Sequence, residues 1–170
     1  MAKRLSKIGY GQLELNQVAF RRDGRIEAQC KLADDIKYVE NGMLLAVDQA
    51  TRTVSMPTGD DDFIALNYTT EHMYDERANA LKNFKLDANS FLPRMGYLSA
   101  GDRYTTNTVE FEGYDDEAAF LAALGTTTLY AHPAADGYHL VNATADNAIA
   151  LAVAATTMPD GQNAVKFVAL

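Results

Sequence analysis

The sequence predicts a mainly β protein, an antiparallel barrel or sandwich with one short helix and an extended N-terminal arm. Apolar and polar residues alternate over many short stretches, which is the pattern of half-buried strands. Turn-forming residues separate these stretches at intervals of roughly ten residues, as in β-sandwiches and barrels. Only residues 115–125 carry an apolar stripe at helical spacing. A parallel α/β fold, which needs a helix between successive strands, is therefore not expected.

The composition fits one folded domain. The chain has 170 residues, 48% of them hydrophobic and 22% charged, which is the ordinary range for a globular protein with its own core. We divide it into an arm, residues 1–12, and a β domain, residues 13–170, with residues 113–125 as an alternative internal boundary. No apolar run reaches the roughly 18 residues of a membrane span, and residues 1–10 lack the apolar core of a signal peptide. We therefore expect synthesis in a cytoplasm and no membrane partner.

Charge is distributed unevenly along the chain. The net charge is −8, but residues 1–31 hold seven Lys and Arg against three Asp and Glu, so this part carries +4 and the remainder −12. Nucleic-acid binding needs clustered basic residues across a face, so we expect no nucleic-acid partner. An acidic body with a basic arm favours docking onto a protein that has acidic patches.

The first half of the chain predicts two hairpins and one irregular excursion. Residues 13–32 alternate with period two, and a three-residue loop at 23–25 with Gly24 or a neighbour left-handed aligns their apolar faces. Residues 43–47 form a continuous apolar run, typical of a strand buried on both faces, which returns through residues 51–56. A further strand is expected at 63–68. Periodicity then disappears over residues 69–89, where 71–77 would form one helical turn, and we expect a partner-contacting loop there.

The second half predicts one helix among strands. Strands are expected at residues 94–98 and 104–111. Asp115 is the expected N-cap of a helix with Phe120, Leu121 and Leu124 on its apolar face and Gly125 at its end. Further strands follow at 126–131 and 138–142. The last hairpin pairs residues 149–156 with 164–170 around the turn at 158–161, which has Pro159 and Gly161 in typical turn positions.

The residues that carry chemistry show no catalytic, cofactor or metal-ligating pattern, and we predict none of these sites. His72, His132 and His139 have no metal-ligand spacing, although His132 and His139 lie close across a predicted turn. Three acidic runs have the wrong spacing for a calcium loop, and we interpret them as solvated or capping charge. They are Asp34–Asp35, Asp60–Asp62 and Asp115–Glu117. Cys30, the only cysteine, is expected to be a small buried residue.

Nine tyrosines and no tryptophan are present. Tyrosines could form a stacking platform for sugars or single-stranded nucleic acid, with Tyr97 and Tyr104 as the residues to test. Half-buried strand positions and protein interfaces are the commoner places for tyrosine, and this interpretation is preferred.

Two stretches of the sequence carry a resemblance to a known protein family. One runs from Leu81-Lys82-Asn83-Phe84 through Phe91-Leu92-Pro93-Arg94-Met95-Gly96-Tyr97-Leu98 to Gly101-Asp102-Arg103-Tyr104-Thr105-Thr106-Asn107-Thr108-Val109. The other begins at Gly9-Tyr10-Gly11-Gln12-Leu13-Glu14-Leu15 and continues into Phe20-Arg21-Arg22-Asp23-Gly24-Arg25-Ile26-Glu27. Both stretches resemble structural proteins of tailed bacteriophages that are usually linked with virion genes near that of the major capsid protein. The resemblance therefore implies a capsid decoration or cement role, and it supplies no active site.

These observations lead us to expect a non-enzymatic virion protein on the capsid surface. Its partners would be the major capsid protein and neighbouring copies of itself, and it would be oligomeric in the assembled particle. The expected partner-binding residues are Lys3, Arg4, Leu5, Lys7, Ile8, Tyr10, Tyr74 and Arg77. A tail or connector protein and a β-type module for carbohydrate or another small ligand are the alternatives, and an enzyme is the third choice.

Overall fold

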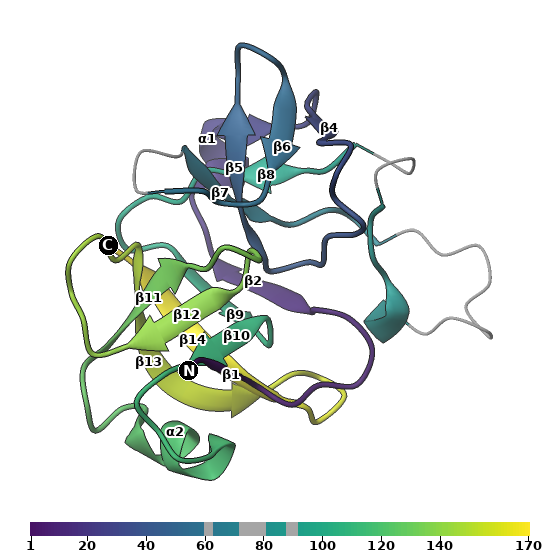
Figure 1. Ribbon diagram of the computed structural model, residues 1–170. Helices are drawn as coiled ribbons and strands as arrows, with labels where there is room; N and C mark the ends of the chain where they lie inside the picture. Colours follow the sequence, from purple (N-terminus) through teal and green to yellow (C-terminus); the bar gives the residue numbers. More distant parts are fainter. Residues whose placement is uncertain (60–62, 72–80, 88–91) are drawn as a thin grey trace.

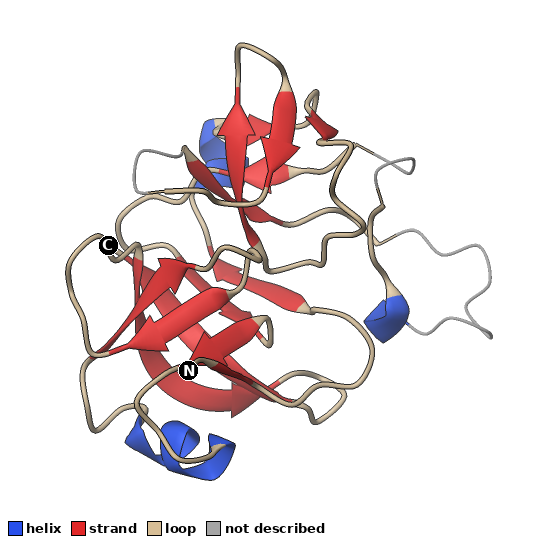
Figure 2. Ribbon diagram, in the orientation of Figure 1, coloured by secondary structure: helices blue, strands red, loops and turns tan. Residues whose placement is uncertain are grey.

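The computed structural model describes residues 1–59, 63–71, 81–87 and 92–170. It is mainly β, with two sheets that pack against each other in a sandwich-like arrangement (Figures 1 and 2). Neither sheet closes into a barrel among the described residues. The predicted fold class is therefore confirmed as a sandwich.

The larger sheet holds both ends of the described chain. Its strands are β1 Lys3–Arg4, β2 Leu13–Gln17, β9 Arg103–Thr106, β10 Val109–Phe111, β11 Leu129–Pro133, β12 His139–Asn142, β13 Ala150–Thr157 and β14 Asn163–Ala169. They lie in the order β1-β10-β12-β11-β13-β14-β9-β2. All neighbours are antiparallel except β10 and β12, which run parallel.

The smaller sheet is formed by the chain between residues 26 and 96. Its strands are β3 Ile26–Glu27, β4 Lys31–Leu32, β5 Leu44–Asp48, β6 Thr53–Ser55, β7 Ile64–Asn67 and β8 Met95–Gly96. They lie in the order β3-β8-β7-β5-β6-β4, and β4 runs parallel to β6. Both sheets are thus mixed, which corrects the purely antiparallel expectation: β4 and β10 each reach a strand distant in the chain that runs in the same direction.

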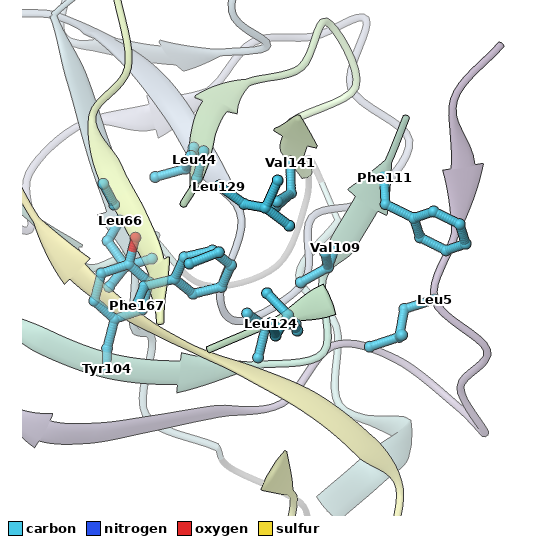
Figure 3. Packing of buried hydrophobic residues seen from close by; sticks show 14 of the residues in the cluster. Leu5, Leu44, Leu66, Tyr104, Val109, Phe111, Leu124, Leu129, Val141 and Phe167 are labelled. Atoms are coloured by element: carbon cyan, nitrogen blue, oxygen red, sulfur yellow. The ribbon is translucent and has the colours of Figure 1, made fainter. Parts of the chain in front are cut away.

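The core lies between the sheets, with a second cluster on the outer face of the smaller sheet. Leu44 and Leu66 of the smaller sheet join Tyr104, Val109 and Phe167 of the larger one in the first cluster (Figure 3). Leu45 and Ala65 adjoin Leu44 and Leu66 in the sequence, and their side chains belong to the second cluster. Strand β5 is therefore buried on both faces, as its continuous apolar run predicts.

The predicted hairpin at residues 13–32 is wrong. Strand β2 pairs with β9, and the chain then turns through α1 (Phe20–Asp23) before β3 pairs with β8. Gly24 ends α1 with φ 69°, so the left-handed expectation at this glycine is confirmed. The helical turn buries Phe20 against Gly96 and Tyr68, and this burial outweighs the local pairing that the alternation favours.

The second half follows the prediction closely, with two corrections. Strands β11 and β12 pair as neighbours, and β13 and β14 form the last hairpin. Helix α2 (Glu117–Ala123) is capped by Asp116 rather than Asp115, because the Asp116 side chain accepts a hydrogen bond from the Ala119 N–H at 2.8 Å. The strand expected at 104–111 is two strands, β9 and β10, interrupted at Asn107 and Thr108.

The chain crosses from the larger sheet to the smaller one at residues 18–25 and returns at residues 97–102. Residues 113–125, the alternative boundary, contain α2, and the strands on either side of it belong to the same sheet. Within 69–89, the described part holds a 3₁₀ turn, η1 (Leu81–Asn83), and a bridge between Val39 and Leu86; the helical turn expected at 71–77 lies almost wholly outside the described residues. No helix in the described part of the chain is long and apolar enough to span a membrane.

Candidate functional site

The N-terminal arm is extended, as expected, but it lies on the body of the chain. Strand β1 pairs with β10. The Lys3 ammonium donates to the carbonyl oxygens of Tyr114 and Asp115. Arg4 donates to Glu110 at 2.8 Å and forms an ion pair with Asp136.

Deeper contacts hold the middle of the arm. Leu5 is buried in the core (Figure 3). Lys7 is paired with Glu40 and donates to the Tyr138 hydroxyl, and burial lowers the pKa of Lys7. The Gly11 N–H also donates to Glu40, at 2.6 Å. These residues of the arm contact their own chain in this structure, and their binding to a partner stays a prediction.

Of the remaining expected partner-binding residues, the structure describes Ile8 and Tyr10. Ile8 is exposed, whereas Tyr10 is half-buried with its ring edge-on to Tyr38 at 5.4 Å. Tyr74 and Arg77 lie outside the described residues. The six described residues do not form one exposed surface, because Leu5 is buried in the core and Tyr10 is half-buried.

Large apolar side chains gather instead where the two sheets meet. Phe63 is 59% exposed just before β7, and Leu170 is 54% exposed at the end of the chain. Together with Tyr97 and Leu98, which follow β8, they line a groove of about 280 Å³. We call this surface the inter-sheet groove and define it by Arg25, Phe63, Tyr97, Leu98, Ile149 and Leu170.

Hydrogen bonds hold the groove in place from several elements. The rings of Phe63 and Tyr97 contact each other with centroids 4.7 Å apart. The Tyr97 N–H donates to the Arg25 carbonyl at 3.0 Å, and the Tyr97 hydroxyl accepts from Gln49 at 2.7 Å. The Leu170 N–H donates to the Ile149 carbonyl at 3.0 Å. The groove thus combines exposed apolar side chains with polar lining groups and one cationic side chain, Arg25, on a fixed backbone.

Sequence reasoning missed Phe63 and Leu170 as surface residues. The alternation places each of them at the end of an expected strand, at 63–68 and 164–170. Both strands stop one residue short of these positions, since β7 starts at Ile64 and β14 ends at Ala169. The one signal in the sequence is their position next to turn or terminal residues, where large apolar side chains have no inward neighbour.

The two tyrosines named as residues to test for a stacking surface lie in different environments. Tyr104 is fully buried and its hydroxyl hydrogen-bonds to His139 at 3.0 Å, so it is not available to a ligand at the surface. Tyr104 lies on the face of β9 that packs against the core, where its ring stacks on Phe167. Tyr97 remains half-exposed beside Phe63.

The two described histidines, His132 and His139, do not converge. His132 pairs opposite Leu140, and His139 opposite Pro133, so the two imidazoles point to opposite faces of the sheet. His72 and Asp60–Asp62 lie outside the described residues, and no group of three or more His, Cys, Asp or Glu in the described part could hold a metal ion. Cys30 is buried, as expected, and burial raises the pKa of its thiol.

No protein-family model matches the sequence, and neither a curated protein nor a solved structure is significantly similar to it.

Proposed function

We propose that this chain is a non-enzymatic structural protein of a tailed-bacteriophage virion that decorates or cements the capsid by binding the major capsid protein through the inter-sheet groove. The observation that carries the proposal is the exposure of Phe63 and Leu170 on one surface with Tyr97. The resemblance of the sequence to phage structural proteins supports the choice of partner.

Apolar side chains of this size favour burial by a partner. Exposed aliphatic and aromatic groups gain roughly 25 cal/mol for each Å² of apolar area removed from water. Aromatic anchors and arginine are enriched among the residues that dominate protein interfaces. Phe63, Tyr97 and Arg25 supply both kinds of group at one groove.

The groove also suits a rigid contact. Its residues come from segments tied down by backbone hydrogen bonds at Tyr97 and Leu170, so little conformational entropy is lost when a partner binds. On a capsid, neighbouring copies would add avidity, because each copy that touches two capsomers binds more tightly than through one contact.

The test is binding to capsids stripped of this protein. We expect Phe63→Asp and Leu170→Asp each to weaken binding at least tenfold, because each places a charge in the apolar contact. Leu92→Asp is the matched control, since Leu92 is 52% exposed but does not line the groove, and it should bind like the unmodified chain. Equal binding by all three variants would refute the groove as the contact surface, and no binding by the unmodified chain would refute the capsid role.

A contribution of the arm is tested separately with Ile8→Asp. Deleting residues 1–12 would remove Leu5 from the core and confound binding with folding. Ile8 is 64% exposed, so its substitution leaves the core intact. Weaker capsid binding by Ile8→Asp would support contact through the arm, and unchanged binding would argue against it.

A carbohydrate-binding module is the second candidate, favoured by the paired rings of Phe63 and Tyr97 beside Gln49 and Glu27. Gln49 donates both to the Tyr97 hydroxyl and to Glu27, so polar groups flank an aromatic surface. A glycan-array signal that is lost in Tyr97→Ala would support this candidate over the capsid role. A tail or connector protein would instead form ring-like oligomers in solution.

A further inference from the structure

A second surface lies at the free edge of the larger sheet. Four strands stand at sheet edges in the described part of the chain, and β1, β3 and β4 have only two residues each. Strand β2, with five residues, is the longest of these edges. An edge of this length presents unpaired backbone groups that can template another strand.

The residues whose backbone faces outward on β2 can be assigned. The Gln12 N–H donates to Asn107 at 2.8 Å and its carbonyl accepts from the Thr106 hydroxyl at 2.7 Å, so the peptide groups of Gln12 face β9. The register of β2 with β9 shifts between Glu14 and Gln17. Leu13 and Leu15 nevertheless both pack against the core cluster, so their side chains share a face and regular alternation holds up to Leu15. This alternation turns the peptide groups of Leu13 and Leu15 toward the outer edge. Outside the ladder with β9, neither residue has a backbone hydrogen bond to any described residue.

Two adjoining grooves flank this edge. One, of about 490 Å³, has an apolar floor that includes Leu13, Met158 and Pro159. The other, of about 370 Å³, is lined by Leu13, Leu15 and Tyr68 among others. An added strand points alternate side chains to opposite faces, so grooves beside its path can receive them.

Charge around the first groove selects the occupant. Among the described residues that line it, Glu14, Glu71 and Asp160 stand against one cation, Lys82. A like-charged strand would be repelled, and pairing with β2 of a second copy would bring two such acidic rims together.

We propose that the outer edge of β2 binds an extended, basic and apolar peptide segment of a partner protein by strand addition. The peptide backbone pairs with Leu13 and Leu15, an apolar side chain enters the groove at Met158 and Pro159, and Lys or Arg side chains meet the carboxylates. This site is separate from the inter-sheet groove and does not depend on the capsid role.

The probe is a fluorescent hexapeptide of sequence Lys-Val-Lys-Ile-Lys-Val, with Glu-Val-Glu-Ile-Glu-Val as its acidic counterpart. Fluorescence anisotropy with the full chain should show binding of the basic peptide at least tenfold tighter than that of the acidic one. Equal affinities, or no binding of the basic peptide, would overturn the proposal.

Two substitutions test the mode of binding. Leu15→Pro removes an N–H that points to the outer edge, and it removes no hydrogen bond to β9. Edge strands tolerate proline at such a position. The variant should bind the basic peptide about tenfold more weakly, and its circular dichroism spectrum should stay unchanged. If this variant loses its native spectrum, Glu14→Lys replaces it, since the Glu14 side chain makes no hydrogen bond or ion pair to a described residue. In Glu14→Lys, the ratio of the affinity for the basic peptide to that for the acidic peptide should fall at least fivefold. Peptide binding like that of the unmodified chain in both variants would refute strand addition.

Two further measurements distinguish the β2 edge from the inter-sheet groove and from a contact between copies. Phe63→Asp, in the inter-sheet groove, should bind the basic peptide like the unmodified chain. Sedimentation of the unmodified chain should show a monomer. A dimer that Leu15→Pro dissociates would assign the edge to a second copy and overturn the proposed occupant.

Discussion

His139 shows how a buried polar side chain is held in this core. Its ring stacks on Phe167 with centroids 4.7 Å apart. Nδ1 lies 3.3 Å from the Thr108 carbonyl oxygen and Nε2 lies 3.0 Å from the Tyr104 hydroxyl. A carbonyl can only accept, so Nδ1 carries the proton and Nε2 accepts from Tyr104. Burial lowers the pKa of His139 to about 3, and the neutral ring is the form that fits.

This environment predicts acid destabilisation. In the unfolded chain the pKa of His139 returns to its ordinary value of 6.5, so between about pH 6.5 and 3 the unfolded state binds the extra proton. The neutral His139 ring contributes its full stabilisation above pH 6.5. As the pH falls through this window, the free energy of unfolding decreases by about 1.4 kcal/mol per pH unit. Urea denaturation of His139→Gln should show a shallower loss of the free energy of unfolding than wild type. His132→Gln is the control and should keep the wild-type slope; an unchanged slope in His139→Gln would contradict the assignment.

The pair of Lys7 and Glu40 gives a second prediction at this scale. Glu40 is buried and accepts from Lys7, Gly11 and Tyr138. Lys7→Met should lower the free energy of unfolding by about 3–5 kcal/mol, because it leaves a buried carboxylate without its cation. The double variant Lys7→Met with Glu40→Gln should recover part of this loss. Lys3→Met, on the same arm but exposed, should cost under about 1 kcal/mol, and equal losses at Lys3 and Lys7 would contradict the buried pair.

At the scale of elements, the arm behaves as part of the fold. Strand β1 covers β10, and Leu5 is buried beside it. Leu5→Ala should lower the free energy of unfolding by about 2–5 kcal/mol, because it leaves a cavity in the core. Ile8→Ala, three residues away and exposed, should change it by under about 0.5 kcal/mol. Chemical denaturation measures both, and similar small effects would mean that the arm is detached in solution.

The same elements show what the sequence could reveal. Alternation predicts which face of a strand is buried, but it does not choose the partner strand. The predicted partner is correct for β13 and β14, where the turn at 158–161 fixes the pairing. It is wrong for β2, whose partner β9 lies far along the chain. Leu5 stands alone in a basic segment, so nothing local indicates its burial.

The candidate site is harder to predict for the same physical reason. Phe63, Tyr97 and Leu170 come from three separate segments, and only the packing of the two sheets brings them together. The basic residues of the arm stand out as a group, yet their acidic partners Glu40, Glu110 and Asp136 are scattered along the sequence. Pairing of charges across the fold is invisible to charge counting along the chain.

At the scale of the whole molecule, the two sheets share one core. Along the sequence, the strands of the smaller sheet lie between β2 and β9, which are neighbours in the larger sheet. Leu44 and Leu66 of the smaller sheet contribute to the cluster that contains Phe167. Exposing either inner face would expose the other, because their apolar side chains interdigitate. The described residues are therefore expected to unfold as one cooperative unit, although they form two sheets.

Native-state hydrogen exchange tests this cooperativity. The amides of Leu45 in the smaller sheet and Leu151 in the larger should exchange with the same free energy, and calorimetry should show a single transition. Leu66→Ala should lower both free energies equally, by about 2–5 kcal/mol, because the lost side chain belongs to the shared cluster. If Leu151 kept its wild-type protection while Leu45 lost it, the sheets would be separate folding units, and the inter-sheet groove would lie between parts able to open independently.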